Sequence, residues 1–106
     1  MITVNFLSSD ERIHGFELSG HAESGPYGHD LVCAAVSAVS FGAANALMEV
    51  ADCEPEVTQG GEGGYLKVVL TGEDREKEKA QTLLEGLLIS LRTIEHDYSQ
   101  YITITK

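Results

Sequence analysis

The sequence predicts an α+β fold in which two helices pack against one mainly antiparallel sheet, within a single domain of residues 1–106. Three observations lead to this fold class. Apolar residues alternate at both ends of the chain and again after residue 53, two longer segments follow a helical pattern, and the segments are grouped in the order ββαββαβ. No linker or repeat divides the chain.

The first two predicted strands lie in residues 1–8 and 13–20. Ile2, Val4 and Phe6 occupy every second position, which is the period of a strand with one buried face. The polar residues 8–12 turn the chain, and Phe16 and Leu18 then share one face of the second strand. We expect the two segments to form a hairpin.

The first predicted helix begins after Asp30 and continues to about residue 51. Asp30 occupies the N-cap position, where its carboxylate accepts hydrogen bonds from the amides of the first turn. The helix is apolar nearly all round, so we expect it to be buried on more than one face, under a sheet or at a subunit contact. Gly42 within it indicates that a neighbouring backbone approaches closely.

The second half of the chain repeats the grouping of strands and helix. Residues 53–72 predict two strands around a glycine-rich turn, and residues 100–106 predict a short final strand. Between them, residues 73–99 predict an amphipathic helix. Its apolar positions are Ala80, Leu83, Leu84, Leu87, Leu88, Leu91 and Ile94.

The charge balance restricts the class of partner. The net charge is −10, so the protein repels phosphate backbones and anionic membranes, and we expect neither nucleic-acid nor membrane binding. The acidity either maintains solubility or attracts a basic protein. No signal peptide and no apolar run of about 18 residues is recognisable, so we expect a cytoplasmic chain without a membrane segment.

Only two cysteines are present, Cys33 and Cys53. If one helix separates them, their Cα atoms are nearly 30 Å apart, at a rise of about 1.5 Å per residue. A disulfide requires Cα atoms within about 7 Å, so we expect reduced thiols, as in a reducing compartment.

The segment "GHAESGPYGHDLVCAAVS", residues 20–37, contains the parts of a thiol active site. Cys33 is the third residue after the predicted cap, so we expect it in the first helical turn, where exposed amides lower the pKa of a thiol. His21 ends the second strand, and the intervening loop is long enough to return it to Cys33. An imidazole there would take the thiol proton and later give it to a leaving amine.

Three neighbours would complete such a site. The backbone amides near Val32 and Cys33 are positioned to stabilise an oxyanion. Asp30 would oppose ionisation of the thiol, so it fits better as the helix cap or as the group that orients His21. Ser37 lies one turn after Cys33 on the same face, where it could hydrogen-bond into the site or simply pack in an Ala-rich contact.

Other interpretations of these residues remain open at this point. A cysteine within "LVCAAVS" is by default a small core residue, and a redox-sensing thiol is a further alternative. His14, His21, His29 and Cys33 lack the short spacings of a zinc site, so we expect no metal and no other cofactor. Cys53 lies between two acidic residues that raise the pKa of its thiol.

The remaining histidines are expected to be structural. His14 falls within a predicted strand. His96 lies near the end of the second helix, where a cation suits the helix dipole.

The combination "GHA", a short loop ending in "GHD", and "LVCAAVSA" strongly resembles the bacterial ribosomal-processing cysteine protease family. The resemblance covers residues 20–38 closely. It implies an α+β cysteine endopeptidase with His21 and Cys33 as the catalytic pair and with Asp30 and Ser37 as supporting polar residues. It also implies a homodimer that removes a short N-terminal extension from a large-subunit ribosomal protein, cutting after aromatic residues.

The acidic charge agrees with this resemblance, because ribosomal proteins are basic. Gly25 and Gly28 flank Tyr27 in a segment that forms either a mobile lid over the substrate or an ordinary surface loop. The alternative function is a non-catalytic ribosome-associated module that holds a basic protein on its acidic surface.

Overall fold

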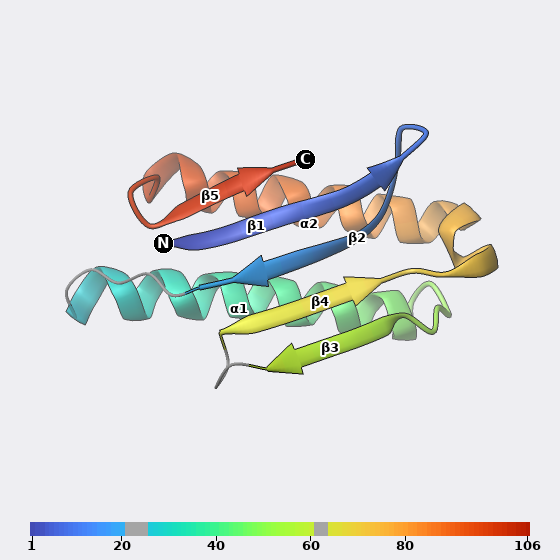
Figure 1. Ribbon diagram of the computed structural model, residues 1–106, viewed down its shortest axis with the longest axis horizontal. Helices are drawn as coiled ribbons and strands as arrows, with labels where there is room; N and C mark the ends of the chain where they lie inside the picture. The colour runs from blue at the N-terminus through green and yellow to red at the C-terminus, as the bar shows by residue number, and fades with distance from the viewer. Residues whose placement is uncertain (21–25, 61–63) are drawn as a thin grey trace.

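The computed structural model describes residues 1–20, 26–60 and 64–106, and for residues 26–30 it describes the backbone only. The chain runs through β1 (Ile2–Ser9), β2 (Arg12–Ser19), α1 (Pro26–Glu49), β3 (Glu56–Gly60), β4 (Tyr65–Val69), a 3₁₀ helix η2 (Gly72–Glu76), α2 (Glu78–Asp97) and β5 (Ile102–Thr105) (Figure 1). This confirms the predicted α+β class and the order ββαββαβ, with η2 as an addition.

The five strands form one sheet in the order β3-β4-β2-β1-β5. All neighbours are antiparallel except β1 and β5, which run parallel. The predicted β1–β2 hairpin is confirmed. It turns through Asp10 and Glu11, whose φ angles of 52° and 65° suit a tight hairpin turn.

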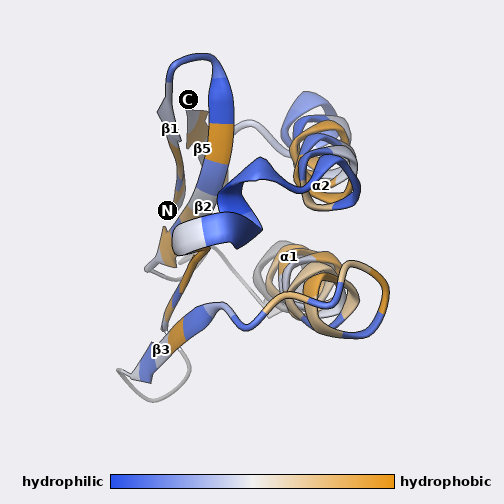
Figure 2. Ribbon diagram, turned by 90° about the vertical axis from the view of Figure 1, so that its right-hand side faces the viewer, coloured by the Kyte–Doolittle hydropathy of each residue, from blue (hydrophilic) through white to orange (hydrophobic). Residues whose placement is uncertain are grey.

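Both helices lie on the same side of the sheet (Figure 2). The strand periodicity explains this arrangement, because Ile2, Val4 and Phe6 point to one face and are almost completely buried. The apolar stripe of α2 is buried in the same core, as predicted, at Ala80, Leu84, Leu87, Leu88 and Leu91. The helices also pack against each other.

The start of α1 differs from the prediction. The helix begins at Pro26 rather than after Asp30, so Asp30 lies inside it and is not its N-cap. Proline is well suited to the first helical turn, because its fixed φ is helical and its missing N–H has no intrahelical partner there. Tyr27 and Gly28, predicted as loop residues, therefore belong to the first turn of α1.

Within the single chain α1 is buried on one face, against the sheet and α2, and the predicted burial of a second face at a subunit contact stays a prediction. Val32, Val36, Ser40, Ala44 and Leu47 form a single buried stripe, whereas the opposite side is exposed within one chain. Gly42 lies on that exposed side, and a Cβ added there would meet nothing within 4 Å. No backbone in the described part of the chain approaches Gly42, because the sheet and α2 lie on the other side of the helix.

The length of α1 requires a further correction. By length and hydropathy alone, its segment Leu31–Glu49 is sufficient to cross a membrane, contrary to the expectation that no such segment exists. The core helix of a soluble protein meets the same two criteria. In this fold the segment contributes its buried stripe to the core shared with the sheet and α2.

Candidate active site

Cys33 lies on α1, beside the ends of the central strands. Its side chain is partly buried and borders a cavity of about 70 Å³. The cavity is lined by Ile2, Leu18, Gly20, Cys33, Val36, Ser37 and Gly64. The structure thus places Cys33 at an accessible cavity rather than in the centre of the core, which removes the default interpretation of a fully buried cysteine.

Ser37 lines the same cavity, as its position one turn after Cys33 predicts. The four-residue spacing places both side chains on one face of α1. Val36, next to Ser37, is buried and anchors this part of the helix to the core. The relative positions of Cys33 and Ser37 are therefore set by α1 itself and do not depend on a loop.

Gly20 connects this cavity to the histidine of the motif. Its N–H donates to the carbonyl of Gly64 at 3.0 Å, and both glycines line the cavity. His21 follows Gly20 in the sequence and lies outside the described residues. The last described residue before it, Gly20, lines the cavity that Cys33 borders.

Only glycine fits at position 20. Its φ is +91°, and a Cβ there would lie 2.4 Å from the carbonyl oxygen of Met1. A side chain would have to displace the start of β1 or the end of β2. Gly20 therefore fixes the direction in which the chain leaves β2 towards His21.

The helix-start mechanism predicted for Cys33 is wrong in this structure. Cys33 follows Pro26 by seven residues, so it lies beyond the first turn of α1. The field of a helix dipole falls off within that turn. The amides of Val32 and Cys33 are likewise interior helix amides, which donate to carbonyls four residues earlier and are not available for an oxyanion.

The structure describes some of the predicted supporting residues only by their backbone and others not at all. Asp30, Tyr27 and Gly28 have a helical backbone, and the side chains of Asp30 and Tyr27 are outside the described residues. Gly25 also lies outside them. The segment around Gly25, Tyr27 and Gly28, predicted as a mobile lid or a surface loop, is helical from Pro26 on and so is not a loop there, and its role as a lid stays a prediction.

Cys53 is separate from this site, as predicted. It is 3% exposed, and its thiol contacts the carbonyl of Ala51. Burial raises the pKa of the Cys53 thiol, and the Asp74 carboxylate adds to the effect. The sequence predicted that the adjacent acidic residues raise this pKa, but burial is the larger cause. The two cysteines do not form a disulfide with each other.

The sequence analysis did not identify Ile2, Leu18 and Gly64 as part of this site. Leu18 and Ile2 were interpreted only as core-facing strand residues. The signal for Gly64 was weak, since it is one of four glycines between residues 60 and 64 that were interpreted as a turn. Its contribution depends on the pairing of β2 with β4, which no local pattern specifies.

A family model described as cysteine protease Prp matches residues 1–103. The chain belongs to the Prp family of cysteine proteases. The ribosomal processing cysteine protease Prp of Bacillus subtilis is 43% identical over 100 residues, which cover 92% of this chain and 89% of the relative. The Staphylococcus aureus Prp is 37% identical over 105 residues, which cover 98% and 97%.

Solved Prp structures share the fold over the whole chain. The essential ribosomal processing protease Prp from S. aureus, in complex with a covalently linked product peptide, matches with a TM-score of 0.90 at 37% identity, covering 100% of both chains. The same protease with a substrate peptide matches with a TM-score of 0.89 at 36% identity, again over 100% of both. The family resemblance of residues 20–38 is therefore confirmed.

Proposed function

We propose that this protein is a cysteine endopeptidase that removes a short N-terminal extension from a large-subunit ribosomal protein precursor. Cys33 is the nucleophile and His21 is the general base. The observation that supports this assignment most directly is the cavity shared by Cys33, Ser37 and Gly20, the residue before His21. Membership of the Prp family supplies the reaction class.

The reaction follows from the chemistry of these two side chains. His21 takes the thiol proton, and the Cys33 sulfur attacks the scissile carbonyl to form a tetrahedral intermediate. The intermediate collapses when the protonated imidazole gives its proton to the leaving amine, which leaves a thioester on Cys33. Water, deprotonated by His21, then hydrolyses the thioester and restores the thiol.

The supporting residues take roles that agree with the observed helix. Asp30 lies inside α1 rather than at its N-cap, so its proposed role is to orient the imidazole of His21. Ser37 lines the cavity beside Cys33 and offers a hydroxyl donor to the reacting groups. Gly25, Tyr27 and Gly28 remain our proposed substrate-contacting residues, because they belong to the segment between the two catalytic positions.

The charge of the protein supports a basic protein substrate. A net charge of −10 accelerates encounter with a positively charged precursor and disfavours direct binding to nucleic acid. Because the proposed substrate is a newly made ribosomal protein, the proposed site of action is the cytoplasm. Neither a metal nor another cofactor takes part in the proposed reaction.

The test is cleavage of a purified ribosomal protein precursor, followed by mass spectrometry of the products. We expect the native protein and Cys53→Ala to release the extension, and we expect Cys33→Ala and Cys33→Ser to release none. Cys53→Ala is the matched control, since it removes the other thiol. Undiminished cleavage by both Cys33 variants would refute the proposal, and binding without cleavage by the native protein would favour the non-catalytic module.

We also propose that the protein is a homodimer that pairs through the exposed side of α1. Six exposed, uncharged residues on this side are spaced alternately by three and four positions, as in a helix-pairing seam. They are Leu31, Ala34, Ala38, Phe41, Asn45 and Met48. Leu31, Phe41 and Met48 are 55%, 40% and 41% exposed in the single chain.

A second copy of the same chain is the partner that fits this surface best. The stripe carries no charge, so two chains of net charge −10 can approach there without bringing carboxylates together. We expect Phe41→Glu to be monomeric in analytical ultracentrifugation and the native protein to be dimeric. Ile89→Glu, which alters an apolar residue 64% exposed on α2, is the control and should remain dimeric. A monomeric native protein would contradict this proposal.

A further inference from the structure

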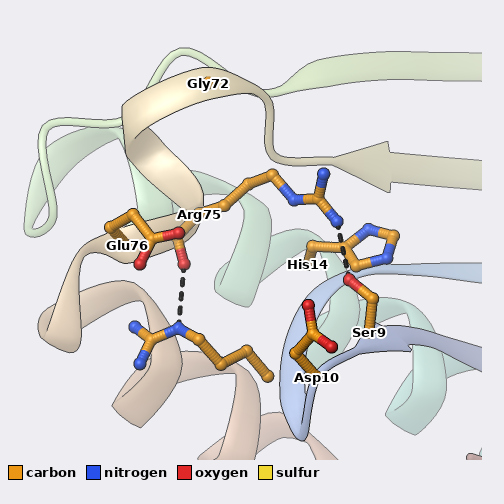
Figure 3. A pocket seen from close by; sticks show the side chains of 7 residues that line it. Ser9, Asp10, His14, Gly72, Arg75 and Glu76 are labelled. Carbon is orange, nitrogen blue, oxygen red and sulfur yellow. Dashed lines mark hydrogen bonds between the residues drawn. The ribbon is translucent and has the colours of Figure 1, made fainter.

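A larger cavity lies near the start of β2, whereas the cavity that Cys33 borders lies near the end of this strand. Its volume is about 470 Å³, and it opens between the β1–β2 turn and η2 (Figure 3). It is lined by Ser9, Asp10, Arg12, His14, Gly72, Arg75 and Glu76. Arg12 and Leu18 are six residues apart on the strand, so roughly 20 Å separates the two cavities. The cavity is therefore separate from the one that Cys33 borders.

Two arginine side chains line this cavity. The whole chain has seven Lys and Arg residues, and two of them, Arg12 and Arg75, line it. The guanidinium of Arg75 extends past His14 and donates to the hydroxyl of Ser9 at 2.9 Å (Figure 3). Arg12 is held in place because its Nε donates to the carbonyl of Arg75 at 3.2 Å. The donors are thus already positioned around a space of ligand size.

Two of these side chains also have unsatisfied buried atoms. Among the described residues, three buried side-chain polar atoms have no hydrogen-bond partner, and two of them are Arg12 Nη2 and His14 Nδ1. Arg12 Nη2 does lie 3.0 Å from a carboxylate oxygen of Glu78, but without hydrogen-bond geometry, and the Glu78 side chain is 84% exposed. Arg12 Nη2 is therefore ion-paired with Glu78, and His14 Nδ1 is the buried atom to which a ligand would supply a missing partner.

The protonation of His14 is affected by its burial and by the neighbouring Arg75. Burial lowers the pKa of His14, and the nearby Arg75 guanidinium lowers it further. An oxyanion in the cavity would offset the positive charge of Arg75 and accept a hydrogen bond from the imidazole. His14, predicted to be structural, therefore acquires a specific partner at this site.

Two carboxylates at the cavity restrict the type of oxyanion. Asp10 and Glu76 are exposed, and neither forms an ion pair within the described part of the chain. A simple anion would be repelled by them. A ligand that also bears hydroxyl groups would instead donate hydrogen bonds to these carboxylates, as ribose hydroxyls do to acidic residues in nucleotide-binding folds.

We propose that this cavity binds a phosphorylated sugar or nucleotide, with its phosphate on Arg12, Arg75 and His14 and its hydroxyl groups on Asp10 and Glu76. The cavity volume is within the range of small-molecule sites. No Phe, Tyr or Trp side chain lines the cavity, so a nucleotide base would contribute little to binding. The sugar phosphate is therefore the recognised part.

The test is titration of the ¹⁵N-labelled protein with ribose 5-phosphate, AMP, inorganic phosphate and adenosine. We expect ribose 5-phosphate and AMP to bind with similar affinity and to shift the amide resonances of His14, Gly72 and Arg75. Inorganic phosphate should bind more weakly, and adenosine should not bind. Absence of shifts with both phosphorylated sugars at millimolar concentration would overturn the proposal. Equal affinity for inorganic phosphate would overturn the role of the hydroxyl groups.

Variants identify the residues that bind. Arg75→Ala should weaken ribose 5-phosphate binding about tenfold, which is the effect of losing a charge-assisted hydrogen bond. Arg75→Lys should retain part of the affinity, because it keeps the charge. The matched control is Arg92→Ala, which removes an arginine of α2 that does not line the cavity. Circular dichroism verifies folding of each variant, and unchanged affinity in folded Arg75→Ala would contradict the assignment.

Discussion

The side-chain amide of Gln81 forms hydrogen bonds with both backbone groups of Ile13. Gln81 Oε1 accepts from the Ile13 N–H at 2.9 Å, and Gln81 Nε2 donates to the Ile13 carbonyl. The pairing register of β1 and β2 is irregular here, since Leu7 faces Gly15 whereas Ser8 faces Ile13. Gln81, which is buried on α2, thus binds both backbone groups of Ile13 next to the interruption of the ladder.

We therefore predict that Gln81→Ala lowers the free energy of unfolding by about 2 to 3 kcal/mol, because it leaves a buried N–H and a buried C=O without partners. Urea denaturation measures this effect. Gln81→Glu should cost at least as much as Gln81→Ala, since its buried carboxylate cannot donate to the Ile13 carbonyl and loses its hydration. A loss below about 0.5 kcal/mol for Gln81→Ala would show that the two hydrogen bonds contribute little.

Gly15 and Gly86 should respond in opposite directions to the same substitution. A Cβ on Gly15 would lie 2.5 Å from the carbonyl oxygen of Val68 on the neighbouring strand, whereas Gly86 on α2 has nothing within 4 Å. We predict that Gly15→Ala destabilises the protein by about 1 to 3 kcal/mol because β2 and β4 must move apart. Gly86→Ala should stabilise it by up to about 1 kcal/mol. Thermal unfolding of both variants tests the pair, and equal midpoints would contradict it.

Much of the fold was predictable because each element has its own local period. The alternation at Ile2, Val4 and Phe6 and the helical spacing of α2 require no knowledge of distant residues. The strand order could not be predicted, since the parallel pairing of β1 with β5 joins residues about a hundred positions apart. The role of Gln81 was hidden for the same reason, because its partner Ile13 is 68 residues away.

The active site was predictable only in part. The spacing of Cys33 and Ser37 placed both on one helix face, which is a local property. The start of α1 was predicted wrongly because Asp30 has the chemistry of an N-cap and Pro26 was interpreted as a loop residue, although proline also suits a first turn. The proposed pairing of His21 with Cys33 rests on the family motif, since residue types alone left a core cysteine as the default.

Ser40 offers a test of packing in α1. It is completely buried, and its Oγ has no hydrogen-bond partner among the described residues. We predict that Ser40→Ala raises the free energy of unfolding by about 1 kcal/mol, because it removes an unsatisfied polar atom and improves helix propensity. Ser90→Ala on α2 is the control for propensity and should give a smaller gain. A destabilised Ser40→Ala would mean that Oγ has a partner, such as a bound water.

Asp74 should make stability depend on pH in acid. The Glu54 N–H donates to its carboxylate at 2.9 Å and Lys77 forms an ion pair with it at 3.0 Å, and these two contacts lower the pKa of Asp74 below its ordinary 3.8. A carboxylate with a depressed folded-state pKa stabilises the fold above its unfolded pKa. That contribution is lost as the pH falls from about 4 through the folded value. We therefore expect the native protein to lose stability in this window.

The comparison of Asp74→Asn with the native protein isolates this contribution. Asparagine keeps an acceptor for the Glu54 N–H but cannot titrate, so Asp74→Asn should be less stable near neutral pH and should lose its disadvantage as the pH falls below about 4. Lys77→Met removes both the hydrogen bond and the charge of Lys77 but retains the Glu54 hydrogen bond, which is the first cause of the lowered pKa, so its pH dependence should be reduced but not abolished. The urea concentration at the unfolding midpoint, measured for each protein across this pH range, tests these expectations. A constant difference between the native protein and Asp74→Asn at every pH would show that Asp74 is not the titrating group.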